Sequence, residues 1–285
     1  MSRLELLSAG QLRLDSRRPL ELRSLAVHIS PSASSSAQAA SNTSLAPVSN
    51  LTSASPSGSA RLEMGLTSVL VEVHGPRERR SGTFSGMGSS VQKAHLDVDF
   101  AIDPHAGKER RRRAKGDRRL TELANTISAV FGPVVHTHLY PRSEIAIDVL
   151  VEVDDGGMLP CAINATSLAL QDAGIALSSP VVSLTLGYHL SPSAILLDLT
   201  NQETLSLPSL TLALLANTGG VVLARSEDRT PLEATLAMLD LAQDAASILA
   251  HELDVAARDR TRKLVTAMGG QESSKVDEEF DAMDV

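Results

Sequence analysis

The sequence predicts an α/β fold of two related lobes, each a mixed sheet covered by helices, with a long helix near the C-terminal end. Strand-like runs alternate with helical patterns, the second half repeats the strand-then-helix succession of the first, and a helical pattern extends over 232–267. The chain has 285 residues and 42% hydrophobic content, enough to bury a core of this size. We expect an N-terminal lobe over 1–152, a C-terminal lobe over 153–268 and an acidic flexible tail over 269–285.

The first lobe opens with two strand-like runs, 24–29 and 60–74, on either side of an insertion. Residues 31–59 are almost entirely Ser, Ala, Asn, Thr and Pro and show no hydrophobic periodicity. A segment of this composition cannot bury enough apolar surface to offset the entropy of ordering it. The sequence therefore predicts a disordered insertion, in effect an enlarged hairpin loop.

A helix is well specified after the alternating strand predicted over 94–102. Asp117 stands at the N-cap position, where its carboxylate can accept a hydrogen bond from the first turn. Apolar residues then recur at helical spacing until Gly132 and Pro133 end the helix. Two strands and a helix of small residues complete this region: 134–139, 144–153 and 162–172, the helix being closed by Gly174.

The second half contains four predicted strands and one long helix. Thr230 offers an N-cap hydroxyl, Pro231 occupies the first helical position and Glu233 the third, so the first amides of this helix can be satisfied. The apolar face expected on the helix consists of Leu232, Leu236, Leu239, Ala242 and Ala246. The strands are expected over 181–190, 194–198, 210–215 and 220–224.

Composition excludes several classes of protein. The single cysteine, Cys161, rules out an internal disulfide and a multi-cysteine zinc site, fits a reducing compartment, and is expected to be a small buried hydrophobe. The chain has neither an apolar run of roughly 18 residues nor the apolar stretch of a signal peptide. We therefore expect a protein of the nucleus or cytosol that does not enter a membrane. Aromatic residues make up only 2%, which argues against a base-stacking platform for nucleic acids.

Charge is distributed unevenly along the chain. The net charge of -8 has the wrong sign for an isolated RNA-binding protein, because counterion release needs cations. From Lys108 to Arg119, however, eight cations stand against two acids, a local balance of +6. From Gln271 onward six acids stand against one lysine, a local balance of -5.

The basic run ends in the first turn of the helix that follows Asp117. Arg118 and Arg119 lie there against the positive end of the helix dipole, which costs roughly a few tenths of a kcal/mol each. An anion would reverse that balance, because two guanidiniums and the exposed amides of the turn form a phosphate-sized site. The alternative is a solvated loop or a nuclear-import signal, which the same charge pattern would also produce.

No metal or cofactor site is predicted. His136 and His138 share a face of the strand predicted over 134–139, but two histidines without a third ligand are typical of ordinary surface. Ser143 and Ser191 stand in no recognisable nucleophile elbow.

Several short motifs resemble the RNase PH family and follow its order over residues 4–265. The segment LDSRRPLELR at 14–23 is similar to the opening motif of RNase PH-like exosome subunits, with Ser16 where a glycine is usual. The basic segment before Gly116 most resembles the eukaryotic ring subunit that is related to the archaeal catalytic one. The other motifs are GDRR at 116–119, YPRSEI at 140–145, DGG at 155–157, AINA at 162–165 and LQDAGI at 170–175.

The resemblance implies descent from a phosphate-dependent 3'-to-5' exoribonuclease. Arginines matching Arg118 and Arg119 hold RNA phosphates in that family. We expect these two to contact a single RNA strand without reading its sequence. Some of the preceding cations would assist them: Arg110, Arg111, Arg112 and Arg113.

The catalytic residues of the family are incomplete in this chain. Active members carry Thr-Arg directly after the Asp-Gly-Gly turn, where this chain has Met158 and Leu159. They also carry two aspartates six positions apart that bind a divalent ion. Asp198 matches the first, whereas Thr204 replaces the second, with Glu203 beside it as a substitute carboxylate in principle. We expect no phosphorolysis, a pocket too apolar for inorganic phosphate, and a vestigial Asp198 that acts as a turn or cap residue.

The resemblance also implies partners. The subunit would pair with other RNase PH-like subunits in a six-membered ring, capped by RNA-binding proteins, that threads RNA to a separate hydrolytic nuclease. Its expected role is degradation and processing of rRNA, mRNA and non-coding RNA in nucleus, nucleolus and cytoplasm. The alternatives are an active phosphorolytic exoribonuclease and a purely structural ring scaffold.

Overall fold

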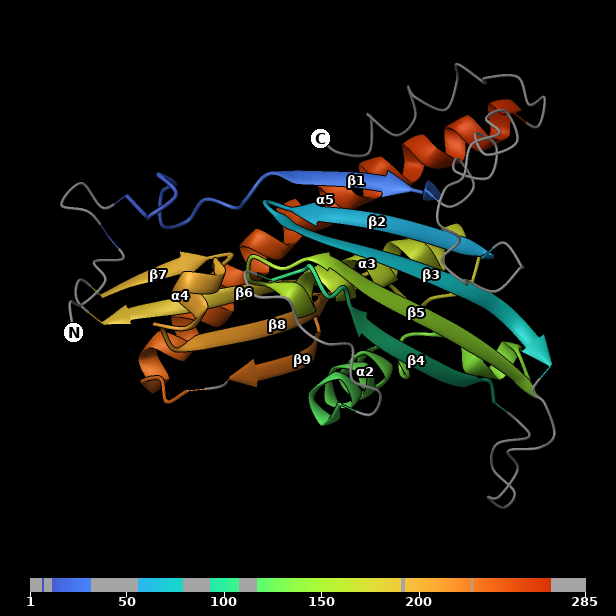
Figure 1. Ribbon diagram of the computed structural model, residues 1–285, viewed down its shortest axis with the longest axis horizontal. Coiled ribbons are helices and arrows are strands. Elements are labelled where there is room, and N and C mark those ends of the chain that lie inside the picture. The colour runs from blue at the N-terminus through green and yellow to red at the C-terminus, as the bar shows by residue number, and fades with distance from the viewer. Residues whose placement is uncertain are drawn as a thin grey trace.

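One continuous hydrophobic core joins the two sheets and the helices that pack on them. The computed structural model describes residues 7, 12–31, 56–78, 93–107, 117–190, 193–226 and 228–267. The sheets lie side by side, with α3 (Met158–Asp172) between them and the long α5 (Leu232–Ala267) running behind both (Figure 1). The α/β fold and the long last helix are therefore confirmed.

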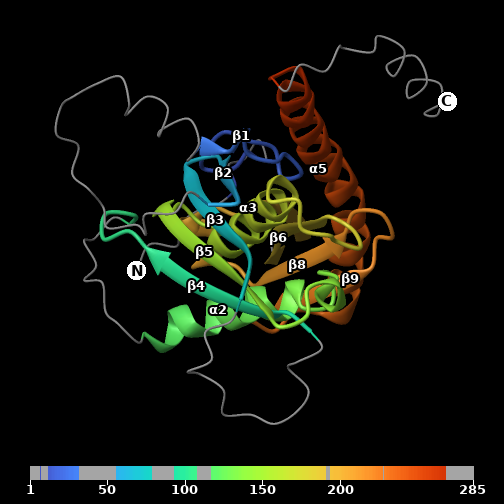
Figure 2. The same ribbon diagram turned by 90° about the vertical axis from the view of Figure 1, so that its right-hand side faces the viewer.

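The first sheet is mixed, as expected. Its strand order is β1-β2-β3-β5-β4, and every neighbouring pair is antiparallel except β4 and β5, which are parallel. The helix α2 (Arg118–Phe131) packs on β4 at one edge of this sheet (Figure 2). The strands are β1 (Leu25–Ile29), β2 (Gly58–Met64), β3 (Thr67–Glu78), β4 (His95–Ile102) and β5 (Ser143–Val153).

The single strand predicted over 60–74 is wrong. This run forms the hairpin of β2 and β3, which turns at Gly65 with a φ of +63°. The apolar alternation continues on both sides of the turn, so periodicity alone did not reveal the break. β1 and β2 are antiparallel, so the insertion does connect a hairpin. The predicted end of the insertion, residue 59, is too late, because residues 58 and 59 belong to β2 and Ser59 is buried. Residues 32–55 of the insertion lie outside the described part of the chain.

The helix predicted after Asp117 is confirmed, whereas the strand predicted over 134–139 is not formed. Asp117 Oδ1 accepts a 3.0 Å hydrogen bond from the backbone N–H of Arg119. The amides of Val134 and Val135 donate to the carbonyl of Phe131, which turns the chain back toward α2. A short 3-10 helix, η2 (Thr137–Leu139), follows.

α3 begins four residues before its predicted start. Pro160 lies in the first turn of the helix, where its missing N–H has no intrahelical partner to lose. Apart from Met158 and the last turn, nearly all of α3 is buried, because the first sheet packs on one side of it and β6 on the other. Asn164 links the two regions: its side chain exchanges hydrogen bonds of 2.9 and 2.6 Å with the backbone of Ser183.

The second sheet is antiparallel throughout, which corrects the prediction of a mixed sheet in each lobe. Its order is β7-β6-β8-β9. Consecutive strands joined by short connections pair antiparallel, because a parallel crossover needs a dozen or more residues. The elements are β6 (Val181–Leu190), β7 (Ser193–Leu197), the one-turn helix α4 (Asn201–Thr204), β8 (Ser209–Leu215) and β9 (Val221–Ser226).

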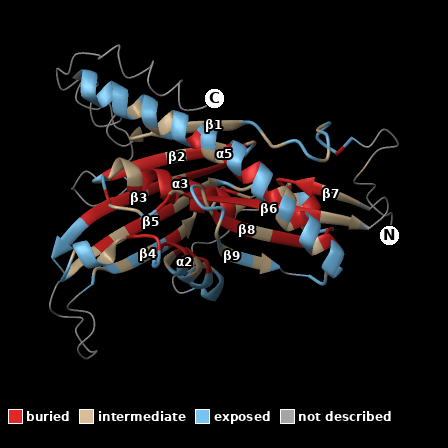
Figure 3. Ribbon diagram, turned by 180° about the vertical axis from the view of Figure 1, so that it is seen from behind, coloured by how far each residue is buried: buried red, intermediate tan, exposed pale blue. Residues whose placement is uncertain are grey.

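The apolar face of α5 differs from the predicted one at its start. Leu232 and Leu236 are 74% and 54% exposed. The face is decided by the side on which β1, β6 and β8 lie. Figure 3 shows α5 from its outer side, which is largely exposed. No helix within the described ranges is long and apolar enough to span a bilayer. The buried residues of α5 are Ala234, Met238, Ala242, Ala245, Ala246, Leu249 and Leu253.

Candidate functional site

A cavity of about 500 Å³ opens where the two sheets meet. The first turns of α2 and α3 line it, together with the turn that follows β5, the helix α4 and residues of β6, β8 and β9. The DGG and GDRR motifs, which lie far apart in the sequence, are therefore brought to one place. The Met158 and Leu159 side chains form an apolar part of the wall, as expected. The rest of the wall is largely polar. That the pocket is too apolar for inorganic phosphate stays a prediction.

The turn before α3 needs two glycines. Gly156 and Gly157 have φ values of +92° and +66°, in the left-handed region that side chains rarely adopt. A Cβ at Gly156 would lie 2.5 Å from the backbone nitrogen of Asn201, so only a glycine lets this turn approach α4. Gly157 is the N-cap of α3 and provides no side-chain hydrogen bond to the first turn. The backbone amides of that turn therefore lie at the wall of the cavity without a side-chain cap.

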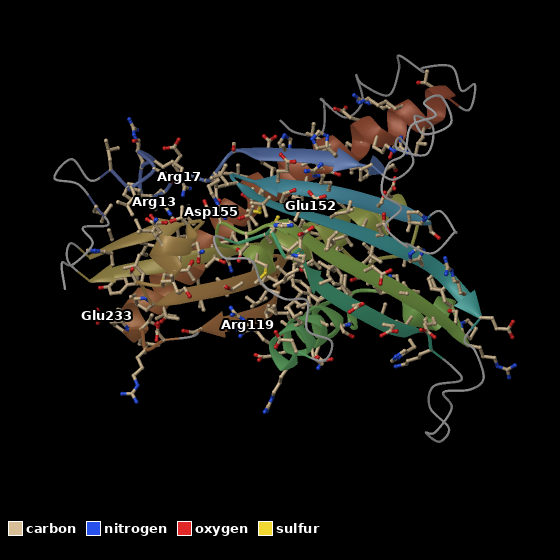
Figure 4. All side chains as sticks on the ribbon, viewed as in Figure 1. Arg13, Arg17, Arg119, Glu152, Asp155 and Glu233 are labelled. Carbon is tan, nitrogen blue, oxygen red and sulfur yellow. The ribbon has the colours of Figure 1, made fainter. Side chains whose placement is uncertain are left out.

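The two arginines predicted to hold RNA phosphates are placed differently. Arg119 lines the cavity and lies beside β9 at the start of α2 (Figure 4). Arg118 is exposed on the same turn and is not part of the cavity wall. The four other predicted ligands lie outside the described residues: Arg110, Arg111, Arg112 and Arg113.

A row of polar side chains crosses the second sheet at the cavity. Thr185 on β6 is paired with Thr211 on β8, which is paired with Arg225 on β9. Directly paired residues share one face of a sheet, and all three line the cavity. The threonine hydroxyls lie 3.3 Å apart, and Arg225 donates from Nη2 to Glu122 Oε1 on α2 at 3.2 Å. Sequence reasoning missed Arg225 and Glu122, since nothing near either residue along the chain signals this contact.

Asp198, which we expected to be a turn or cap residue, lies at the bend that follows β7. It is 1% exposed and has a φ of +52°. Its Oδ2 accepts hydrogen bonds from the backbone N–H and Nε of Arg23, and its Oδ1 accepts a 2.6 Å bond from Arg23 Nη2. Burial lowers the pKa of Arg23, but the hydrogen bonds that Arg23 donates to the Asp198 carboxylate and the charge of that carboxylate outweigh burial and leave the pKa above its usual value. Asp198 is thus one half of a buried ion pair.

Glu203 cannot take the place of a catalytic carboxylate in this arrangement. It is fully buried, and both of its oxygens accept hydrogen bonds from Arg13, one of them at 2.8 Å from Nε. Glu203 also accepts from the backbone N–H of Thr200 and so completes a capping box on α4. Burial raises the pKa of Glu203, but the hydrogen bonds from Arg13 and Thr200 hold it below its ordinary value.

The opening motif thus has a structural role. Arg17 and Arg23, which lie within it, and Arg13, which precedes it, all reach the chain between β7 and α4 (Figure 4 labels Arg13 and Arg17). Ser16 has a φ of +67°, which explains why a glycine is usual at this position. No local pattern predicted the contacts of these arginines with residues 197–203, which lie 175 to 190 residues away along the chain.

Cys161 and the two histidines remain from the residues considered in the sequence analysis. Cys161 is fully buried as predicted, and burial raises the pKa of its thiol to about 12. The rings of His136 and His138 stack edge-to-face with centroids 5.4 Å apart, around η2 and not on a strand. Within the described ranges, no three His, Cys, Asp or Glu side chains gather closely enough to hold a metal ion.

Comparison with known proteins places these features in a family context. The model of the 3' exoribonuclease (RNase PH) family, domain 1, matches residues 21–176. Human exosome complex component RRP41 is 30% identical over 270 residues, which cover 94% of this chain and all of the human protein. Fission yeast exosome complex component ski6 is also 30% identical, over 94% of this chain and all of its own length.

Two solved structures have the same fold. Rice Rrp46 superposes with a TM-score of 0.69 at 21% identity, covering 86% of this chain and all of Rrp46. A chain of the Archaeoglobus fulgidus exosome, with RNA bound to its active site, superposes with a TM-score of 0.63 at 17% identity, covering 85% of this chain and 93% of the archaeal one.

Proposed function

Because this chain belongs to the RNase PH family, we propose that it is a non-catalytic ring subunit of the RNA exosome that binds and threads single-stranded RNA. The proposal rests above all on one observation. Arg119 and the start of α3 share a cavity in which Met158 and Leu159 stand where active members carry Thr-Arg.

RNA binding is supported by the charge and position of α2. Arg118 and Arg119 are exposed at its start, and no acidic residue lies in its first turn. Cations at the start of a helix are repelled by the positive end of the helix dipole, and a bound phosphate backbone would relieve that repulsion. The archaeal exosome structure named above has RNA bound to its active site, and it contains a chain of the same fold.

Loss of catalysis is supported by three substitutions and one contact. The hydroxyl and guanidinium of the phosphate site are replaced by Met158 and Leu159, and the second aspartate by Thr204. The first aspartate, Asp198, is already held by Arg23. Removal of one preorganised electrostatic group typically costs about 3–4 kcal/mol of transition-state stabilisation, so the loss of three leaves no measurable rate.

Charge reversal at the start of α2 tests RNA binding. Combining Arg118→Glu with Arg119→Glu should weaken binding of single-stranded RNA to the assembled ring by about tenfold or more, and reduce the salt dependence of binding. Fluorescence polarisation measures the affinity, and size-exclusion chromatography shows whether the ring assembles. A matched control reverses two exposed arginines of α5, Arg258 and Arg262. Unchanged RNA binding and crosslinking in the α2 variant would support the scaffold alternative instead.

A phosphorolysis assay tests the second half of the proposal. The purified chain, alone and with its ring partners, is incubated with RNA, magnesium and inorganic phosphate. We expect no nucleoside diphosphates above background. Their release by the wild-type chain would establish the alternative, an active phosphorolytic exoribonuclease.

Further parts of the proposal concern partners and place in the cell. The subunit would join other RNase PH-like subunits in a six-membered ring with RNA-binding caps and a separate hydrolytic nuclease. It would act in the nucleus, nucleolus and cytoplasm on rRNA, mRNA and non-coding RNA. The relatives described above are named as exosome components, which supports this assembly. Co-purification followed by mass-spectrometric identification of the bound subunits tests it.

A further inference from the structure

Arg225, like Arg119, lines the cavity described above. The two arginines come from different parts of the molecule, since Arg119 begins α2 beside the first sheet and Arg225 lies on β9 of the second. Both are among the residues that enclose the same space of about 500 Å³. The cavity is therefore lined by one arginine from each of these two parts of the molecule.

Glu122 directs the guanidinium of Arg225. Glu122 lies one helical turn after Arg119 on α2, and its Oε1 is 3.2 Å from Arg225 Nη2. The Glu122 side chain is 62% exposed and that of Arg225 31% exposed, so the pair contributes little to stability. Its effect is to hold the planar fork of Arg225 at the junction of α2 and β9. A guanidinium can bind a carboxylate along one edge and a phosphate along another.

The neighbouring side chains suit a sugar–phosphate backbone. Thr185 and Thr211 continue the row from Arg225 into the cavity and offer hydroxyls to phosphate or ribose oxygens. The acidic groups on the same wall, Glu122 and Asp154, equal the two arginines in number. Only the guanidiniums can donate hydrogen bonds to a bound phosphodiester, because ionised carboxylates are acceptors.

We propose that Arg225 is a second ligand for the RNA backbone, which grips the strand from the β9 side while Arg119 contacts it from α2. This inference rests on the proposed function, because it assumes that the strand passes Arg119. Arg225 contacts phosphate without reading bases, so its contribution is independent of RNA sequence.

The test compares three single variants of the full chain: Arg225→Ala, Arg119→Ala and the control Arg258→Ala. Arg258 is likewise an arginine paired with a carboxylate, Asp254 at 2.7 Å, but it lies on α5. The probe is a fluorescently labelled oligouridylate, titrated at several salt concentrations with the chain alone and in its assembled ring. Arg225→Ala should weaken binding about five- to tenfold and lower the slope of log affinity against log salt by about 1. Thermal melting should show that all three variants remain folded.

The outcomes separate this inference from the function on which it rests. If Arg119→Ala weakens binding and Arg225→Ala does not, the strand passes α2 without touching β9, and the role of Arg225 is refuted alone. If neither variant changes affinity or slope, both proposals fail. If Arg258→Ala produces the same loss as Arg225→Ala, the effect is one of general charge and the assignment of Arg225 is rejected.

Discussion

Replacing Arg13 with methionine should lower the free energy of unfolding by about 3–5 kcal/mol, because it would leave the Glu203 carboxylate buried without its partner. The side chains of Arg13 and Glu203 are 0% and 1% exposed. Arg13 also donates to the carbonyls of Leu197 and Asp198, so the variant loses contacts with the whole segment before α4. Urea denaturation followed by circular dichroism measures the change.

Two further variants make this measurement decisive. Arg258→Met removes an exposed ion pair with Asp254 and should cost no more than about 1 kcal/mol. Combining Arg13→Met with Glu203→Leu removes both buried charges and should recover part of the lost stability. If Arg13→Met costs no more than Arg258→Met, the buried pair does not stabilise the fold as we infer.

The same pair predicts how stability depends on pH. The pKa of Glu203 is lower in the folded chain than in the unfolded one, so the unfolded state binds more protons at acidic pH. Its contribution is therefore complete above the ordinary glutamate pKa of about 4.3 and is lost as the pH falls through the folded value. The double variant Arg13→Met with Glu203→Leu should therefore lose less stability than the wild-type chain as the pH falls through this range.

Replacing Gly156 with alanine should destabilise the protein by about 3 kcal/mol or more and disturb the cavity. The new Cβ would lie 2.5 Å from the nitrogen of Asn201 and 2.6 Å from the carbonyl carbon of Thr200, which are backbone atoms that cannot turn away. The φ of +92° adds backbone strain for any side chain. The turn and α4 must then move apart, so RNA affinity should fall together with thermal stability.

Gly219 offers a control with the strain but without the collision. Its φ is +65°, and a Cβ there would meet nothing within 4 Å. Gly219→Ala should therefore cost only about 1 kcal/mol. Equal losses in the two variants would show that the approach of the 154–157 turn to α4 contributes nothing beyond backbone conformation.

Much of the fold could be predicted because its signals are local. The N-cap at Asp117, the helix end at Gly132 and the strand over 144–153 all follow from residues within a few positions of one another. The errors also have local causes. Alternation that continued through Gly65 hid a hairpin, and Pro160 concealed a helix start although proline is tolerated in the first turn.

The candidate site was predicted in part. The arginines of α2 and the altered residues after the DGG motif were recognisable from their motifs, and the structure brings Arg119, Met158 and Leu159 to one cavity. The polar wall was missed. Thr185, Thr211 and Arg225 become neighbours only through the pairing of β6, β8 and β9, which no spacing along the chain reveals.

Most of the periodic elements and the family motifs could be determined from the order of the amino acids, since each depends on residue type and near neighbours. Tertiary structure alone decided which charges are paired and which remain at the cavity. Arg13 and Arg23 bind Glu203 and Asp198 across 190 and 175 residues of chain, and burial makes those contacts strong. Arg119 and Arg225 line a common cavity for the same reason: folding, and not distance along the sequence, sets which groups become neighbours.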